Sequence, residues 1–245
     1  MTKRERIERL DYLPGWERAI YQRPDIFSYS MDAVLLGKFA QLPKSGEGKI
    51  MDLCTGTGAV PLIMSQRTRT FIEAVEIQPV LASLAEKSVH ENNLADQVRV
   101  MEADILELDG LVRWESYDTV TCNPPYFPVT AEKGKNVNNH LSLARHEIAC
   151  TLDDVIRVSS RLVKQKGRVA IVHRPERLPD IFGTMVKYRL EPKRIQYVHP
   201  KSDREANIVL VEAVREGKPG IKTMPPWIVY GEDDTYTREF KEHYE

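Results

Sequence analysis

Segments that read as buried β-strands alternate along this chain with segments that read as helices, and this alternation limits the possible folds more than any other feature. The strand-like segments are short apolar runs, whereas the segments between them repeat apolar residues at helical spacing. Such alternation predicts βαβ units, in which helices cover both faces of a mainly parallel sheet. The expected strands span residues 49–54, 71–76, 98–101, 118–122, 168–172, 194–198 and 207–213.

The connection between the last two expected strands, Pro200–Ala206 with its flanks, is too short for a helical crossover. We therefore expect an α/β fold with a mainly parallel sheet of seven strands and one antiparallel strand at an edge. A chain of 245 residues suits one large domain of this kind. We divide it into an N-terminal segment with a helix that packs on the core (1–48), the α/β core (49–215) and a C-terminal tail (216–245).

Several classes of protein are disfavoured by the sequence. No apolar run approaches the roughly 18 residues that a membrane span needs, and the charged start Met1–Arg6 is followed by no apolar stretch that would make a secretory signal. Three widely spaced cysteines, Cys54, Cys122 and Cys150, argue against a disulfide framework and fit a reducing compartment. We expect a cytoplasmic protein without a membrane partner, whose cysteines are small buried side chains.

Charge is distributed unevenly along the chain. The net charge is −1, yet residues 157–204 hold 13 Lys and Arg against 4 Asp and Glu, which gives this segment a charge of +9. A local basic face is typical of proteins that bind phosphate-bearing partners, although solvated helix faces also collect Lys and Arg. Arg189, Lys193 and Arg194 are the candidates for contacts with such a partner.

Polar or acidic residues mark the carboxyl ends of the first four expected strands. These are Asp52 with the loop that follows it, Glu76, Asp104 and Asn123. Ligands of open α/β sheets bind in the crevice outside those ends. The sequence therefore predicts one ligand site at this edge of the sheet.

The loop after the first strand lets a ligand approach the backbone closely, because Gly56 and Gly58 lack side chains and adopt positive φ readily. It lacks the Gly-Lys-Ser/Thr ending of a phosphate-binding P-loop, and Pro61 stands where a dinucleotide fingerprint needs its third glycine. A carboxylate at Asp52 suits a ligand that carries a positively charged amino group. The alternative is a tight strand-to-helix turn without a ligand.

Two further acidic residues at this edge could bind the ribose and the adenine of a nucleoside. Glu76 at a strand end could accept hydrogen bonds from both hydroxyls of a ribose, and a solvated strand end is its alternative. Asp104 could accept a hydrogen bond from an adenine amino group, while a simple helix N-cap would explain it equally well.

The corner Asn123–Tyr126, with the sequence Asn-Pro-Pro-Tyr, directly follows the fourth strand. Its amide oxygen and the Pro124 carbonyl are the two acceptors that a planar NH₂ group requires, and Tyr126 offers a ring to stack on the same plane. Such a site would prepare a nitrogen to attack an electrophilic methyl group. A plain turn is the alternative, since Asn-Pro and Pro-Pro pairs are common in loops.

Together these residues resemble the Rossmann-like class I methyltransferases that use S-adenosylmethionine and modify planar nitrogens. Residues 27–37 are similar to an N-terminal motif of the bacterial tRNA adenine-N6 methyltransferases that act beside the anticodon of a valine tRNA, and residues 144–147 also resemble that group. The resemblance extends over about residues 10 to 215. It implies S-adenosylmethionine as the cofactor, RNA and in particular tRNA as the substrate, and chemistry that requires no metal.

The resemblance also implies roles for individual residues. Asp52, Gly56 and Gly58 would hold the methionine part of the cofactor, while Tyr29, Ser30 and Asp32 would close over it. The candidate cofactor-binding residues are Tyr29, Asp32, Asp52, Cys54, Thr55, Gly56, Gly58, Glu76, Ile77, Asp104, Ile105 and Asn123. The candidate catalytic residues are Asn123, Pro124 and Tyr126, and the candidate substrate-binding residues are Pro125, Phe127, Arg145, Arg189, Lys193 and Arg194.

Other targets remain open at this point. The same corner occurs in methyltransferases that act on guanine N2 of ribosomal RNA and on a protein glutamine amide, and a non-catalytic RNA-binding module could use the same fold. The chain is too short for the additional domains that the guanine, glutamine and DNA adenine enzymes usually carry. RNA adenine is therefore the preferred target, and Pro61 argues against a nicotinamide oxidoreductase.

Overall fold

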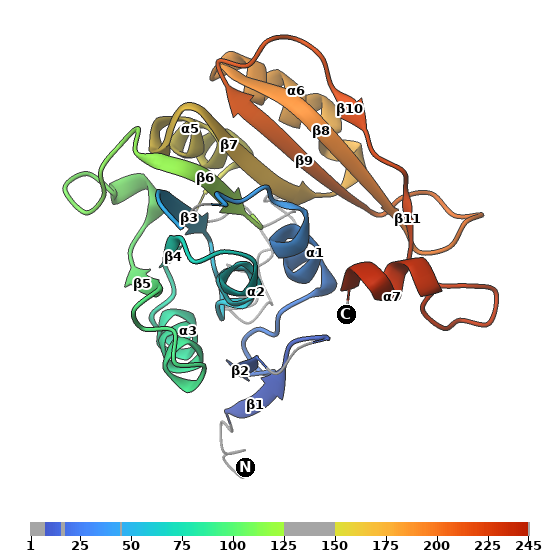
Figure 1. Cartoon of the computed structure of the whole chain (residues 1–245), viewed down its shortest axis with the longest axis horizontal. Coiled ribbons are helices and arrows are strands. Elements are labelled where there is room, and N and C mark those ends of the chain that lie inside the picture. Colours follow the sequence, from blue (N-terminus) through green and yellow to red (C-terminus); the bar gives the residue numbers. More distant parts are fainter. Residues whose placement is uncertain (1–7, 16–17, 45, 125–149, 245) are drawn as a thin grey trace, which may run out of the picture.

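The computed structural model describes residues 8–15, 18–44, 46–124 and 150–244, and it is built around one twisted sheet (Figure 1). The strand order is β10-β8-β9-β7-β6-β3-β4-β5, with β11 also beside β8. Seven strands form the body of the sheet, as predicted. They are β3 (Lys49–Leu53), β4 (Phe71–Glu76), β5 (Val98–Glu102), β6 (Tyr117–Cys122), β7 (Val163–His173), β8 (Leu190–His199) and β9 (Ile208–Arg215).

The antiparallel strand is β9, which pairs antiparallel with both β7 and β8. Its predicted place at an edge is wrong, because β8 lies outside it, and the two-residue strands β10 (Lys222–Thr223) and β11 (Trp227–Ile228) pair in parallel with β8. A short connection requires antiparallel neighbours but leaves open on which side the strand returns. The inner position buries Val209, Leu210 and Val211 completely.

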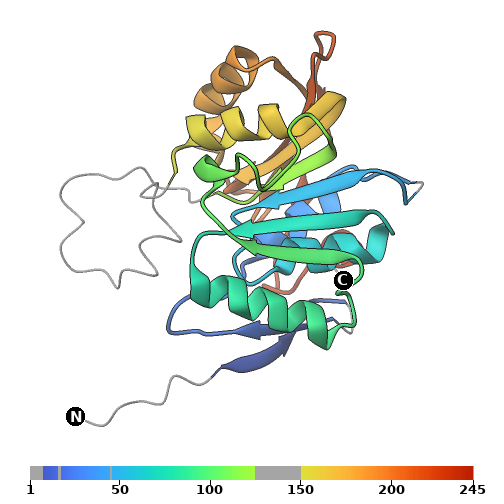
Figure 2. The same cartoon turned by 90° about the vertical axis from the view of Figure 1, so that its left-hand side faces the viewer.

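Helices cover both faces of the sheet, which confirms the predicted class (Figures 1 and 2). Alternate strand residues serve opposite cores, as the two-residue period of a strand requires: Ile50 and Ala170 join one core, whereas Met51 and Val169 join the other. The first core packs against α1 (Met31–Phe39), α2 (Ala59–Arg67) and α3 (Pro79–Glu91), and the second against α5 (Leu152–Leu162), α6 (Leu178–Lys187) and the short turn η1 (Ile105–Glu107).

Helix α5 begins with a capping box. The Thr151 hydroxyl accepts a hydrogen bond from the Asp154 backbone N–H, and the Asp154 carboxylate accepts one from the Thr151 N–H. The helix ends at Leu162, and Gly167 lies inside β7. A Cβ at Gly167 would stand 2.5 Å from Val163 Cγ2 and 3.0 Å from the Asp118 carbonyl oxygen, so close strand packing explains this glycine.

Both terminal segments pack on the α/β core. The hairpin of β1 (Arg9–Tyr12) and β2 (Ala19–Gln22) lies beside α3, where the Asn92 side chain bonds both the N–H and the carbonyl of Ala19 (Figure 2). The helix α7 (Arg238–Tyr244) lies near α1 (Figure 1), and the turn η2 (Pro175–Arg177) precedes α6. No helix in the described part of the chain has the length and apolar character to span a membrane.

Candidate cofactor and catalytic site

Neighbouring parallel strands bring the predicted site residues to one edge of the sheet. In the β3–β4 and β3–β6 pairs, Leu53 lies opposite both Val75 and Cys122. The residues that follow these strands therefore leave the sheet side by side, and β5 continues the row beyond β4. The loop after Asp52, the carboxylate of Glu76 and the side chain of Asn123 belong to this edge.

Asp52 is a fully buried carboxyl group whose two oxygens differ in their hydrogen bonding. Its Oδ1 accepts a hydrogen bond from the Thr121 hydroxyl at 2.5 Å, whereas its Oδ2 has no hydrogen-bond partner among the described residues. Burial raises the pKa of Asp52 to about 7. A buried carboxylate oxygen without a donor is costly alone and suits a cationic amino group.

The loop between β3 and α2 has the backbone that its glycines predict. Gly56 and Gly58 have φ of +59° and +88°, and Cys54 also adopts a left-handed conformation at +55°. A Cβ on Gly56 would lie 3.2 Å from the Phe27 ring, and one on Gly58 would lie 3.3 Å from Cβ of Ala85. Both glycines are thus required by conformation and by close neighbours. Buried hydroxyls at Thr55 and Thr57 have no hydrogen-bond partner within the described ranges.

Glu76 joins the glycine loop to the start of α3. Its Oε2 accepts a hydrogen bond from the Gly56 N–H at 2.8 Å, and its Oε1 accepts one from the Gln78 N–H at 2.9 Å. The side chain is only 5% exposed, and burial raises its pKa. The alternative of a solvated strand end is therefore wrong. Each carboxylate oxygen accepts more than one hydrogen bond, so acceptor capacity remains for hydroxyl donors. Ile77, which follows, is exposed.

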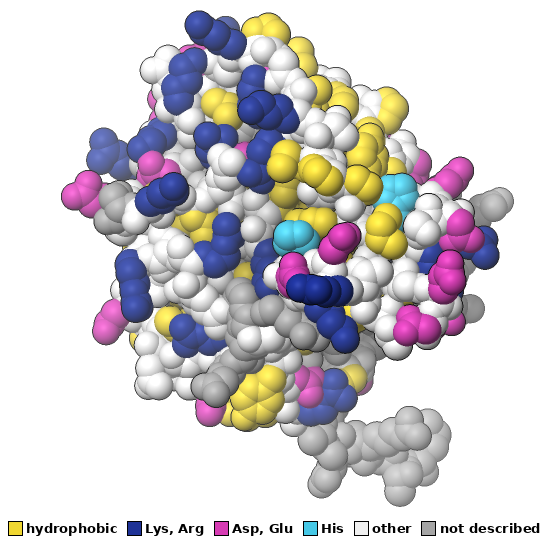
Figure 3. Space-filling view, turned by 45° about the vertical axis from the view of Figure 1, so that its right-hand side comes forward, with side chains coloured by type: hydrophobic (Ala, Val, Ile, Leu, Met, Phe, Trp, Pro, Cys, Tyr) yellow, Lys and Arg dark blue, Asp and Glu magenta, His cyan; other side chains and the backbone are white. Residues whose placement is uncertain are grey.

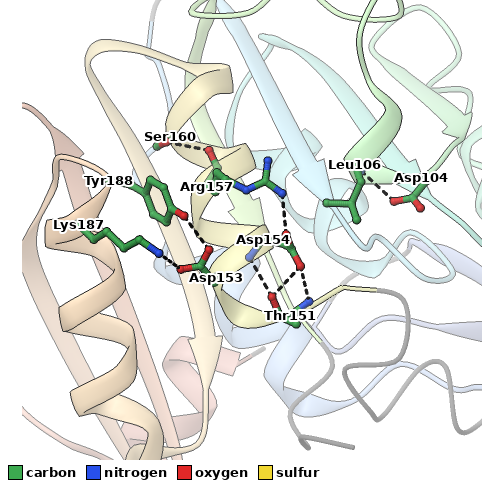
Figure 4. A network of polar contacts seen from close by, with 9 residues as sticks. All are labelled: Asp104, Leu106, Thr151, Asp153, Asp154, Arg157, Ser160, Lys187 and Tyr188. Carbon is green, nitrogen blue, oxygen red and sulfur yellow. Dashed lines mark hydrogen bonds and ion pairs between the residues drawn. The ribbon is translucent and has the colours of Figure 1, made fainter.

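Asp104 is the N-cap of η1 in this structure. Its Oδ1 accepts a hydrogen bond from the Leu106 N–H at 2.8 Å (Figure 4). The side chain is half-buried, and the neighbouring Ile105 is buried. The N-cap that the sequence analysis gave as the alternative is present, and the second carboxylate oxygen is a further acceptor for a ligand.

At the catalytic corner, Asn123 is half-buried and Pro124 is buried, directly after β6. Pro125, Tyr126, Phe127 and Arg145 lie outside the described residues.

The N-terminal motif reaches the glycine loop through a residue to which the sequence assigned no role. Phe27 lies close enough to Gly56 to exclude a side chain at that position. The sequence signal that could have identified Phe27 is its place next to Ser28–Asp32 in the N-terminal motif. The Tyr29 hydroxyl donates to the Tyr12 carbonyl at 3.2 Å, and burial raises the pKa of Tyr29. Ser30 is the N-cap position of α1, and Asp32 lies buried in its first turn.

All three cysteines come together beneath the site. The Cys54 thiol interacts with those of both Cys122 and Cys150, and Cys122 and Cys150 are buried. The pKa of Cys54 is raised chiefly by its hydrogen bond with Cys122, and burial raises the pKa of Cys122. Protonated thiols are poor nucleophiles, which agrees with the prediction that these residues are structural. No group of metal-binding side chains was found among the described residues.

The three basic candidates have different surroundings. Lys and Arg side chains gather on the upper left of the face in Figure 3. Arg189 is 81% exposed and lies 3.9 Å from Glu216, and half-buried Lys193 donates to the Lys218 carbonyl. Arg194 instead lies over the Phe39 ring, donates to the Phe39 carbonyl at 2.7 Å and lies 3.5 Å from buried Glu212. Its described contacts tie α1 to the sheet.

Comparison with known proteins decides the family. The model of the family described as "Methyltransferase small domain" matches residues 17–179. This chain belongs to that family. It is an S-adenosylmethionine-dependent methyltransferase, as the resemblance of its motifs implied.

Curated relatives of this methyltransferase carry the name "tRNA1(Val) (adenine(37)-N6)-methyltransferase". One from Porphyromonas gingivalis is 28% identical over 186 residues, which cover 74% of this chain and 72% of the relative. Another from Aliivibrio salmonicida is 30% identical over 189 residues, or 75% of each protein.

Solved structures share the fold. A predicted O-methyltransferase from Agrobacterium tumefaciens superposes with a TM-score of 0.69 at 21% identity, over 87% of this chain and 95% of that one. Geranyl diphosphate C-methyltransferase from Streptomyces coelicolor, crystallised with S-adenosyl-L-homocysteine, gives a TM-score of 0.54 at 16% identity over 74% and 75% of the two chains.

Proposed function

We propose that this methyltransferase transfers a methyl group to the exocyclic N6 of an adenine in RNA, in a tRNA close to the anticodon, and that it acts in the cytoplasm. The observation that carries the proposal is the position of Asn123 directly after β6, next to the strand that ends in Asp52 and the glycine loop. The names of the relatives favour tRNA adenine as the target.

The chain's own residues fit the cofactor at this edge. Asp52 Oδ2, buried and lacking a donor in the described chain, would accept hydrogen bonds from the amino group of the methionine part. Gly56 and Gly58 would keep the loop free of side chains, Glu76 would accept from the ribose hydroxyls, and Asp104 from the adenine amino group. When bound, the cofactor supplies an electrophilic methyl group on a sulfonium.

The corner would prepare the target nitrogen. An adenine amino nitrogen is a poor nucleophile because its lone pair is delocalised into the ring. Hydrogen bonds from its two N–H groups to the Asn123 amide oxygen and the Pro124 carbonyl would favour a more tetrahedral nitrogen with an available lone pair. Tyr126 would stack on the base, with Phe127 beyond it. Alignment of this kind supplies up to roughly 7–11 kcal/mol of barrier reduction in well-oriented systems.

The target base must leave its stack to reach this corner, at a cost of a few kcal/mol. RNA loops present unstacked bases at lower cost than duplexes do, which supports an anticodon loop as the substrate. The nitrogen loses its proton after methyl transfer, so the proposal assigns no general base.

Nucleoside analysis tests the proposal. Purified protein is incubated with unmodified tRNA transcripts and methyl-labelled cofactor, and the RNA is then digested and analysed by mass spectrometry. N6-methyladenosine at a single position is expected from the wild type and is absent with Asn123→Ala. N2-methylguanosine, or label in protein glutamine only, would refute adenine as the target.

A further inference from the structure

A second groove, about 420 Å³ in volume, lies at the opposite edge of the sheet from Asn123. The residues that line it come from the segment before β6, the end of α5, the α6–β8 turn and the end of β9. They are Trp114, Glu115, Ser160, Arg161, Lys187, Tyr188, Arg189 and Arg215. Arg189 is one of the three basic substrate-binding candidates, and the other seven residues belong to no site described above.

Strand β6 sets the distance between the two sites. Glu115 lies two residues before the strand begins at Tyr117, and Asn123 follows its last residue. The six residues of β6 rise by about 3.3 Å each, so the two ends of this strand, one beside the groove and one at the catalytic corner, lie roughly 20 Å apart. A ligand that reaches both places at once must be large.

Four cations line the groove, and each faces one carboxylate. Arg161 lies 3.5 Å from Asp109, Lys187 lies 2.6 Å from Asp153, Arg189 lies 3.9 Å from Glu216, and Arg215 pairs with Glu115. The side chains of the first three cations are 47%, 58% and 81% exposed, in that order. Exposed ion pairs of this kind contribute about 0–1 kcal/mol, so the phosphates of a polyanion can replace the carboxylates at little cost.

Two aromatic rings lie among these cations. The Arg161 guanidinium stands 3.9 Å from the centre of the Trp114 ring, and Lys187 Nζ stands 4.8 Å from the centre of the Tyr188 ring. Grooves that bind single-stranded nucleic acid combine cations for the backbone with rings for the bases. The lining therefore suits a nucleic-acid strand better than it suits an acidic peptide.

The backbone conformation of Arg189 also supports ligand binding at the groove. Its φ is +59°, in the left-handed position after α6 where glycine is preferred. An arginine there costs conformational energy, and its side chain is almost wholly exposed. A strained residue that presents a cation to a groove is a candidate for ligand binding.

Helix α5 links the two sites. It begins at Leu152, close to the Asp104 edge in Figure 4, and ends at Leu162 beside the groove. Arg157 and Arg161 lie one turn apart on one side of this helix, and in Figure 4 the Arg157 guanidinium points toward Asp154. Cations thus continue along α5 between the groove and the site.

We propose that this groove, between Trp114 and Arg189, binds the backbone of the substrate RNA about 20 Å from the methylated base. The inference rests on the proposed function, because it takes the occupant to be the same folded tRNA whose adenine enters the corner at Asn123. The groove would add affinity for a complete tRNA and contribute little to the binding of an isolated anticodon stem-loop.

Binding of two RNAs tests the groove. Fluorescence anisotropy measures the Kd of the full-length tRNA transcript and of the isolated anticodon stem-loop, for wild type, Arg161→Glu, Arg189→Glu and the double variant. Arg238→Glu, at an exposed residue of α7, is the matched control. Thermal unfolding checks that each variant is folded. Arg189→Glu should fold as the wild type does, because it changes a mostly exposed side chain.

Each groove variant is expected to weaken full-length tRNA binding by about tenfold, as loss of a charged hydrogen bond predicts. The dependence of log Kd on log salt should become shallower by about one for each lost phosphate contact. The loss should be at least five times larger for the full-length tRNA than for the stem-loop. Binding equal to that of Arg238→Glu, or equal losses for both RNAs, would overturn the inference.

The outcome separates the groove from the proposed function. If the wild type methylates adenine and the groove variants bind tRNA as the wild type does, the groove inference fails and the function stands. If the wild type methylates no RNA but the variants lose tRNA affinity, the function fails and the groove stands.

Discussion

Glu76 Oε2 accepts a hydrogen bond from the Gly56 backbone N–H at 2.8 Å, which fixes the glycine loop after β3 to the end of β4. The other carboxylate oxygen accepts from Gln78 at the start of α3. One carboxylate thus links two loops at the edge where the cofactor would bind. Its effect on binding would combine direct contacts to ribose with the position of the loop.

Glu76→Ala should weaken S-adenosylmethionine binding by about 1.5–3 kcal/mol, the usual contribution of hydrogen bonds to a charged group. Isothermal titration calorimetry measures the change. Glu102→Ala is the matched control, because Glu102 is the exposed residue opposite Glu76 in the β4–β5 pair. Equal affinities for wild type and Glu76→Ala would remove this carboxylate from the cofactor site.

The sequence predicted the strands and their marked ends because these depend on local patterns. Alternation of apolar runs with helical spacing requires no knowledge of distant contacts, and parallel strands bring their carboxyl ends to one edge whatever their order. Asp52, Glu76 and Asn123 therefore lie where the pattern placed them.

Features that depend on distant partners could not be predicted in this way. The short connection before β9 indicated an antiparallel pair, but only the packing of β9 against β7 places it inside the sheet. In the sequence Arg194 is one more cation in a basic segment, yet in the structure it contacts Phe39 and Glu212 from other elements and is half-buried. The groove at Trp114 likewise joins segments that lie far apart in the chain.

Asn123→Ala should lower the rate of methyl transfer by at least about a hundredfold, because the target nitrogen would lose one of its two acceptors and its alignment. Affinity for the cofactor should remain nearly intact. Single-turnover kinetics with saturating tRNA measure the rate, and calorimetry measures the affinity. A fully active Asn123→Ala protein would refute the role of this amide.

Asp52 should give cofactor binding a pH dependence. Burial raises its pKa to about 7 in the folded protein, against about 3.9 in an unfolded chain. Between about pH 4 and pH 7 the folded state therefore keeps a proton that the unfolded chain has lost. Over this range the contribution of Asp52 to the free energy of unfolding falls as pH rises, by up to about 4 kcal/mol in total.

A cationic amino group favours the ionised carboxylate, so S-adenosylmethionine affinity should increase as pH rises through about 7. In Asp52→Asn the affinity should be lower and this part of the pH dependence should vanish. Calorimetry of both proteins between about pH 6 and pH 8 provides the difference. Parallel pH profiles for the two proteins would contradict the assignment.

Substitutions at Arg194 and Lys193 should distinguish a residue that packs elements together from one that lies at the surface. Arg194→Ala removes the cation from a pair with fully buried Glu212 and leaves the Phe39 ring and carbonyl without it. Loss of one partner from a buried pair costs 3–5 kcal/mol, but Arg168 and the Gln41 N–H still satisfy Glu212, so a loss of about 2 kcal/mol is expected. Lys193→Ala should change stability by less than about 0.5 kcal/mol. Urea unfolding measures both, and equal stability of the two variants would show that Arg194 does not hold α1 to the sheet.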